Sequence, residues 1–329
     1  MGCAVSKSGD KEIEYNVEEQ DLISLPFASI PKNVSKITCA NNKIKELPAE
    51  LSTLRTLKEI DASTNALTTI PADFSTSESI EKLLLFANKI KELPATLPPN
   101  LTELNLFNNQ IKKLPPSIGD LAKLEEVNIA ANKLMMTTDA MFVKWSAVTV
   151  LNLYDNNLVR FGSLVNCVSL TELRLSGNAI EAMPTLSSHP SLKIFEMHKN
   201  RVSVIPDGYF EATPSLERLS LWGNMLTAVP TSLLSCAGLL GVQLQENKIE
   251  ALPGGPYPPR LETLFLHDNL LTTLPQGLKR CFALKRVNIA KLNLDEAGTD
   301  VAEAMKALCI QPGTSGIFWD KSGVQHKSA

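Results

Sequence analysis

One pattern of apolar and polar positions recurs along nearly the whole chain. The stretch LTELNLFNNQIKKLP, residues 101–115, follows the frame L-x-x-L-x-L-x-x-N-x-I-x-x-L-P. The asparagine of this frame falls at Asn42, Asn65, Asn88, Asn109, Asn132, Asn156, Asn178, Asn200, Asn224, Asn247 and Asn269. Successive asparagines are 21 to 24 residues apart. Such regularity indicates an internal repeat rather than chance matches.

Each part of the frame has a structural meaning. Alternating apolar residues are typical of a strand that buries one face. The asparagine stands where the chain turns after the strand, so its buried amide requires hydrogen bonds to neighbouring backbone. The x-x-L-P segment suits an extended or turn conformation that returns the chain. Because no unit can bury its leucines alone, stacked units are expected to form one cooperative solenoid with a parallel sheet on its concave face.

The units resemble the intracellular leucine-rich repeat family with the LxxLP consensus, which includes the Ras-group proteins of plants and animals. The resemblance covers residues 12–294, about 12–13 repeats of 21–24 residues. It implies an α/β solenoid, a leucine-rich repeat horseshoe with short 3-10 or extended segments on its convex face, and a role in binding and scaffolding. Two units, LPPNLTELNL and YPPRLETLFL, are similar instead to the short proline-rich repeats of bacterial effectors.

Different structure is expected at the two ends of the array. Residues 1–11 are predicted to be a flexible tether and residues 295–329 a capping helix with a tail. The stretch TDVAEAMKALCI indicates an amphipathic helix with Thr299 or Asp300 as N-cap. Val301, Met305 and Leu308 would then face the last repeat. Phe318 and Trp319 indicate that part of the tail packs back on the protein, at a place the sequence does not identify.

Composition narrows the possible functions. The formal net charge of −3 is too small to imply nucleic acid or an acidic membrane as the main partner. No apolar run reaches the roughly 18 residues that span a bilayer, and the six cysteines show no disulfide or metal spacing, which is typical of a reducing, intracellular compartment. Cys39, Cys167, Cys236 and Cys281 occupy core positions of the frame, and Cys309 lies on the predicted helix without a nearby base.

The sequence offers no catalytic site. It contains neither a GxGxxG nor a Walker loop. His198 and His267 face the same side of the predicted sheet, but three strand spacings separate them by roughly 14 Å, too far to share a metal ion. His189 falls in the outer core layer and His326 in the tail. We therefore expect no enzyme activity, no metal and no cofactor.

The predicted concave face carries candidate binding residues. Five of the eighteen aromatic residues fall in the two columns that flank the strand leucines. A first cluster is Leu84, Phe86, Asn105, Phe107, Asn128, Asn152 and Tyr154, and a second is Glu196, His198, Trp222, Phe265 and His267. Exposed aromatics beside hydrogen-bonding groups have the composition of binding hot spots. The alternative is that neighbouring aromatics merely shield one another along the sheet, and the binding interpretation is the stronger of the two. A third column changes sign along the chain, from Glu59, Glu103, Glu126 and Glu172 to Arg218 and Arg286, which would orient a partner.

The first six residues, MGCAVS, match the N-myristoylation pattern M-G-x-x-x-[ST]. Gly2 would accept the acyl chain after removal of Met1, and Ser6 supplies the hydroxyl residue of the motif. One myristoyl chain gives only marginal binding, so the adjacent Cys3 is the expected site of a second, palmitoyl chain. We predict a cytoplasmic protein, peripheral on the cytoplasmic face of a membrane.

These features together predict a monomeric, non-catalytic scaffold that binds a protein partner on its concave face and a membrane through its lipids. A regulator of a small GTPase or a protein phosphatase is the alternative among binding proteins. An enzyme or ubiquitin-ligase effector is the alternative of a different class. It would need a catalytic domain beyond the array, and only about 35 residues follow the last unit.

Overall fold

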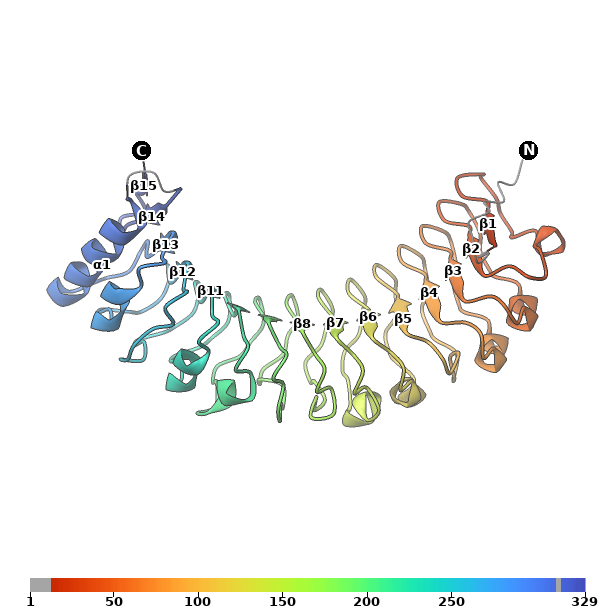
Figure 1. Ribbon diagram of the computed structural model, residues 1–329, viewed down its shortest axis with the longest axis horizontal. Helices are drawn as coiled ribbons and strands as arrows, with labels where there is room; N and C mark the ends of the chain where they lie inside the picture. The colour runs from red at the N-terminus through yellow and green to blue at the C-terminus, as the bar shows by residue number, and fades with distance from the viewer. Residues whose placement is uncertain (1–12, 312–314, 329) are drawn as a thin grey trace. The chain divides into compact units, whose positions relative to one another are not determined.

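The computed structural model describes residues 13–311 and 315–328. The described chain forms two compact units that meet in sequence between Cys167 and Val168. Each unit is a stack of short strands joined by turns, with one strand and one return segment per repeat (Figure 1).

The N-terminal unit contains seven described strands of three residues each. They are β1 (Glu14–Asn16), β2 (Lys36–Thr38), β3 (Glu59–Asp61), β4 (Lys82–Leu84), β5 (Glu103–Asn105), β6 (Glu126–Asn128) and β7 (Val150–Asn152). Neighbours in sequence pair in parallel and in register, so that Leu104 of β5 lies opposite Val127 of β6. The return segments carry short 3-10 helices, η1 (Phe27–Ser29), η2 (Ala49–Thr53), η3 (Ala72–Thr76), η4 (Pro116–Asp120) and η5 (Asp139–Phe142).

The C-terminal unit repeats this arrangement and ends differently. Its strands are β8 (Glu172–Arg174), β9 (Ile194–Glu196), β10 (Arg218–Ser220), β11 (Gly241–Gln243), β12 (Thr263–Phe265), β13 (Arg286–Asn288), β14 (Ile317–Trp319) and β15 (Gln325–Lys327). Its helices are η6 (Tyr209–Ala212), η7 (Thr231–Ser235), η8 (Gln276–Arg280) and α1 (Glu296–Cys309). The strands from β8 to β14 are parallel, and β15 returns antiparallel to β14. The predicted leucine-rich repeat solenoid is confirmed.

The core of each unit lies between the sheet and the return segments. The middle residue of each repeat strand points inward, as with Leu104, Val127 and Leu173, which are fully buried. Behind them the return segments contribute large side chains, such as Phe74, Trp145 and Phe210, to an outer core layer. Cys167, Cys236 and Cys281 are buried in this layer, where the frame predicts apolar residues.

A left-handed residue precedes the asparagine in every repeat. The residues with positive φ at this position are Asn41, Thr64, Ala87, Asn108, Ala131, Asp155, Gly177, Lys199, Gly223, Glu246, Asp268 and Lys291, the last standing before Leu292 where the frame loses its asparagine. Side chains other than glycine adopt this conformation at a cost. The tight turn therefore needs a compensating interaction, and the asparagine side chains supply it.

Asn132 shows the geometry that the asparagines share. Its amide Nδ2 donates to the backbone oxygens of Leu106, Ile129 and Ala130 at 2.9, 3.2 and 3.1 Å, and its Oδ1 accepts from the N–H of Ile111 at 2.9 Å. Leu106 and Ile111 belong to the preceding repeat, so each asparagine connects two turns. Asn132 is 7% exposed, so water does not reach these backbone groups to replace the hydrogen bonds of its side chain.

Replacing Asn132 with alanine is expected to lower the free energy of unfolding by roughly 1–3 kcal/mol, because buried backbone groups lose their partners. Chemical denaturation measures the difference. The matched control is Asn157→Ala, at an exposed asparagine outside the frame position. Equal stability of the Asn132 variant and the parent would contradict a structural role for the asparagines.

The C-terminal cap differs from the sequence prediction in two details. The N-cap of α1 is Asp295, whose Oδ1 accepts from the N–H of Gly298 at 2.7 Å, so the predicted N-cap at Thr299 or Asp300 was wrong. Starting the helix earlier places Val301, Met305 and Cys309 on the buried face, while Leu308 is only half-buried. An amphipathic pattern identifies the helix, whereas its first turn depends on a capping contact.

The tail adds a strand that the sequence analysis did not place. Phe318 of β14 lies opposite Val287 and is buried, and Trp319 lies opposite Asn288 on the other face of the sheet. Gly316 makes this possible, because a Cβ there would overlap the carbonyl oxygen of Cys309 at the end of α1. The tail thus continues the parallel sheet of the C-terminal unit beyond the last repeat.

Candidate functional site

The open face of each sheet, the face opposite the leucine core, is the predicted concave face. Alternate strand residues reach it because side chains along a strand point to opposite sides. All twelve predicted binding residues are half-buried or exposed, which is what this position requires. They form two groups, one in each unit.

The N-terminal surface, defined by Leu84, Phe86, Asn105, Phe107, Asn128, Asn152 and Tyr154, combines aromatic rings with amides. Phe107 and Tyr154 are 39% and 45% exposed, and Ala130, at the corresponding position of the repeat between them, is buried.

The three asparagines of this surface are held in one orientation. The Oδ1 atoms of Asn105, Asn128 and Asn152 each accept the backbone N–H two residues later, at 3.1 Å in every case. Among the described residues, their Nδ2 groups have no protein acceptor. The surface therefore presents a row of fixed amide donors beside the exposed aromatics.

The C-terminal surface, defined by Glu196, His198, Trp222, Phe265 and His267, contains a stacked pair. The rings of His198 and Trp222 are 4.7 Å apart and nearly parallel, and the Lys199 Nζ lies 4.8 Å from the Trp222 ring centre. The His198 Nδ1 lies 2.8 Å from the Ser176 Oγ and 3.2 Å from the Ser220 Oγ. Burial lowers the pKa of His198, and the neighbouring Lys199 lowers it further. His198 is therefore uncharged at neutral pH. Its ring stacks on Trp222, and its Nδ1 contacts the two serine hydroxyls.

Trp319 is a member of this surface that sequence analysis missed. Its ring meets Phe265 edge to face at 6.3 Å, and Phe265 in turn lies 6.3 Å from His267. Burial lowers the pKa of His267 despite the nearby carboxylates of Asp268 and Glu246. The tail sequence Gly316-Ile-Phe-Trp does have the alternation of a strand, with Phe318 directed inward and its two neighbours outward. This stretch falls outside the repeat frame, which is why the frame did not identify it.

A groove of about 360 Å³ opens in the same face around Gly241. Register places Arg218, Gly241, Thr263 and Arg286 at equivalent positions of four adjacent strands. The missing side chain of Gly241 and the short one of Thr263 create a depression between the two arginines. Its wall includes Ser220, Gln243 and Phe265.

The arginines of this groove have no ion-pair partner among the described residues, whereas its glutamates are paired. Glu262 pairs with Lys285 at 2.8 Å, and Glu196 lies 3.6 Å from Arg174. Within residues 13–311 and 315–328, Arg218 and Arg286 form no ion pair or side-chain hydrogen bond. The groove consequently offers two free guanidinium groups, the side chain best suited to bind a carboxylate with two hydrogen bonds.

The predicted change of sign along the third column is weaker than its formal charges. Glu59 pairs with Lys36 and Glu103 with Lys82, both at 3.0 Å, and Glu172 pairs with Arg174 at 2.7 Å. Of the six charged residues named in the sequence analysis, Glu126, Arg218 and Arg286 are the ones without an ion pair in the described structure. Lys36 and Lys82 occupy the same register column as the glutamates that they pair with, and Arg174 lies in the neighbouring column, so these cations offset the negative end.

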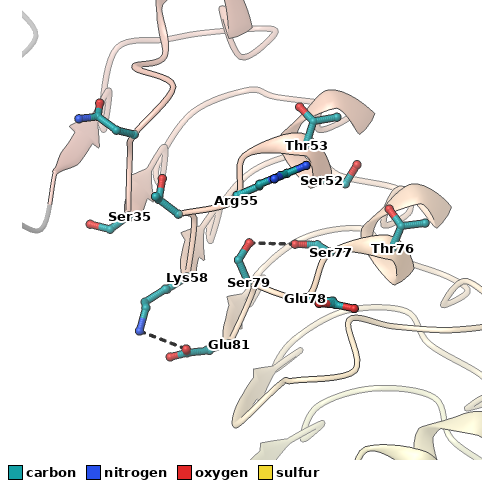
Figure 2. A pocket seen from close by; sticks show the side chains of 12 residues that line it. Ser35, Ser52, Thr53, Arg55, Lys58, Thr76, Ser77, Glu78, Ser79 and Glu81 are labelled. Carbon is teal, nitrogen blue, oxygen red and sulfur yellow. Dashed lines mark hydrogen bonds and ion pairs between the residues drawn. The ribbon is translucent and has the colours of Figure 1, made fainter.

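A hydroxyl-lined groove of about 960 Å³ lies at the edge of the N-terminal unit. Figure 2 shows Arg55 among serine and threonine side chains, with Lys58 paired to Glu81 at 3.2 Å. The hydroxyls of Thr56 and Ser79 donate to the backbone oxygens of Val34 and Leu54 in the preceding repeat. Because these donors already stabilise the turns, we assign the groove a structural role.

The other candidate residues do not assemble into a reactive centre. Burial raises the pKa of the Cys39 and Cys167 thiols to about 12, so neither is a thiolate at neutral pH. His189 is buried in the outer core layer, and His326 contacts Asp320 in the terminal hairpin. The described residues contain no group of three or more metal-binding side chains, and none of their helices has the length and apolar character to cross a bilayer.

The predicted acylation sites, Gly2 and Cys3, lie outside the described residues. Membrane attachment through them stays a prediction.

Comparison with known proteins agrees with the repeat architecture. The family description "Leucine rich repeat" matches residues 122–180, and "Leucine Rich repeats (2 copies)" matches residues 99–139. Keratocan of Gallus gallus is 28% identical over 136 residues, which are 40% of this chain and 38% of keratocan. PH domain leucine-rich repeat-containing protein phosphatase 1 of Homo sapiens is 36% identical over 86 residues, 26% of this chain and 5% of that protein. The chain thus spans well under half the length of these curated relatives.

Solved structures are also similar along most of the chain. The octameric complex of Latrophilin 3, Unc5D and FLRT2 contains a leucine-rich repeat chain with a TM-score of 0.63 and 25% identity, covering 88% of this chain and 85% of that one. The matched segments contain leucine-rich repeats, and the similar solenoid of that complex is part of a protein assembly.

Proposed function

We propose that the protein is a non-catalytic scaffold that captures a protein partner on the open face of its sheets. The observation that carries this proposal is the C-terminal surface, where Trp222, Phe265 and Trp319 stand beside a groove with two unpaired arginines. Aromatic and arginine side chains dominate the energetics of protein interfaces. Leucine-rich repeat solenoids present extended surfaces of this kind to other proteins.

The proposal includes the cell compartment. Acylation at Gly2 and Cys3 would hold the scaffold at the cytoplasmic face of a membrane, so that the partner is captured close to the bilayer. The motif MGCAVS supports this part.

A regulatory subunit for a protein phosphatase or a small GTPase is the second candidate. The short match to a phosphatase with leucine-rich repeats favours the phosphatase version. It predicts that a recovered partner has phosphatase activity, which a phosphopeptide assay on the purified complex measures.

Two surface variants test the scaffold proposal. Trp222→Ala with Phe265→Ala removes the C-terminal anchors, and Phe86→Ala with Phe107→Ala and Tyr154→Ala removes the N-terminal ones. We expect the variant that removes the used surface to lose about 2 kcal/mol of binding, roughly 30-fold in Kd. Partner recovery by proximity labelling, followed by titration of the recovered protein, measures this loss.

The control is Phe282→Ala, because Phe282 is 75% exposed and lies outside both surfaces. All variants should unfold within about 1 kcal/mol of the parent, since surface side chains fill no core volume. If both surface variants fold normally and keep every partner, the open face is not the binding surface.

A further inference from the structure

A flank of the N-terminal unit carries a concentration of lysines that the small net charge conceals. The flank consists of the residues that follow the asparagine turns. A groove of about 690 Å³ on this flank is lined by Lys91, Lys112, Lys113 and Lys133, against a single carboxylate, Glu92. All four lysines are exposed.

These lysines differ from three lysines on the open face and its edge. On the open face and its edge, Lys36, Lys58 and Lys82 each pair with a glutamate at 3.0 to 3.2 Å. For the four flank lysines, the described part of the chain provides no ion pair and no side-chain hydrogen bond. The flank therefore has an excess of positive charge that no protein group neutralises.

Exposed apolar side chains continue the flank into the next repeats. The N–H of Lys133 donates to the oxygen of Ile111, so the turn after Asn132 stacks directly on that after Asn109. Met135 and Met136 follow Lys133 in the same repeat and are 63% and 49% exposed, and Val159 in the next repeat is 42% exposed. The N–H of Val159 donates to the oxygen of Met135 at 3.1 Å, and Met136 bridges to Arg160, which places these residues on one strip.

We propose that this lysine flank docks the N-terminal unit on an anionic membrane surface. Lysines attract the negatively charged lipid headgroups, and neighbouring methionine and valine side chains enter the boundary between headgroups and acyl chains. Unpaired lysines beside exposed apolar side chains match the composition of membrane-surface segments, and a protein partner with an acidic surface is the alternative that vesicle binding separates. The inference rests on the proposed membrane location and adds how the solenoid faces the bilayer.

The test uses the full chain carrying Gly2→Ala, which removes acylation. It should sediment with vesicles of phosphatidylcholine and phosphatidylserine, more weakly at high salt, and not with phosphatidylcholine alone. Changing Lys91, Lys112, Lys113 and Lys133 to Gln should weaken this binding by about tenfold or more, since each basic residue adds to the attraction. A second variant, Met135→Ser with Met136→Ser and Val159→Ser, should weaken it without changing the charge.

The matched control changes Lys32, Lys58, Lys123 and Lys144 to Gln, which alters the net charge equally outside the flank. Binding of the flank variant at the level of the parent, equal loss in the control, or no binding of the parent to phosphatidylserine vesicles would overturn the inference. The modification state of Gly2 in the parent chain distinguishes binding through the flank from anchoring by the acyl chains. If Gly2 proves unmodified while the chain still binds phosphatidylserine through the flank, the tether fails and the flank stands.

Discussion

Trp145→Ala is expected to lower the free energy of unfolding by about 3–5 kcal/mol, the largest stability loss that we predict for a single substitution. The side chain is fully buried in the outer core layer of the N-terminal unit. Its Nε1 donates to the oxygen of Ile118 at 2.9 Å, and its ring meets Phe142 edge to face at 5.3 Å. Alanine removes both contacts and leaves a cavity between two return segments.

Urea unfolding measures this loss. Trp145→Phe is the informative control, because it keeps most of the volume but loses the hydrogen bond, and it should cost about 1–3 kcal/mol. A loss below about 1 kcal/mol for the alanine variant would mean that the return segments collapse freely around the site. Trp222→Ala provides the contrast, since the same residue type on the open face should affect binding and leave stability nearly unchanged.

The second large effect concerns the N-terminus. Gly2→Ala should move the protein from the membrane to the soluble fraction, because the acyl acceptor is lost and Cys3 is then no longer modified beside a first lipid. Cys3→Ser should leave weaker, reversible association, as one myristoyl chain binds with a constant of only about 10⁴ M⁻¹. Fractionation of cells that express each variant measures both effects.

Intact-mass analysis of the parent from a eukaryotic host is the control for this experiment. It should show the mass of one myristoyl chain and of a second, thiol-linked chain that hydroxylamine removes. An unmodified Gly2 would contradict the prediction regardless of where the protein fractionates.

The fold could be predicted because one frame is repeated many times. Alternating leucines and a recurring asparagine define strand, turn and return segment in every unit, so an error in one unit is corrected by the others. The left-handed residues before the asparagines were not predicted, because their identities vary from glycine to threonine and only the backbone position is shared.

The candidate surface was predictable in part. The frame alone identifies Phe107, Tyr154 and Trp222 as open-face residues. The groove at Gly241 depends on an absent side chain between two arginines, and the role of Trp319 depends on a tail that pairs with β13. The groove residues occupy a frame position at which the residue type varies, and Trp319 lies outside the frame, so the repeated pattern indicates neither feature.

The terminal hairpin has a consequence for self-association. A parallel stack that stopped at β13 would expose a row of backbone N–H and C=O groups, a template on which a second molecule could add its own strand. In this protein β14 occupies that edge, and β15 pairs antiparallel with β14 and carries polar side chains, including His326, which contacts Asp320 at 2.8 Å. Residues 317–327 thus cover the edge of β13, and we expect their removal to promote strand addition between molecules and insoluble polymers even though every repeat remains intact.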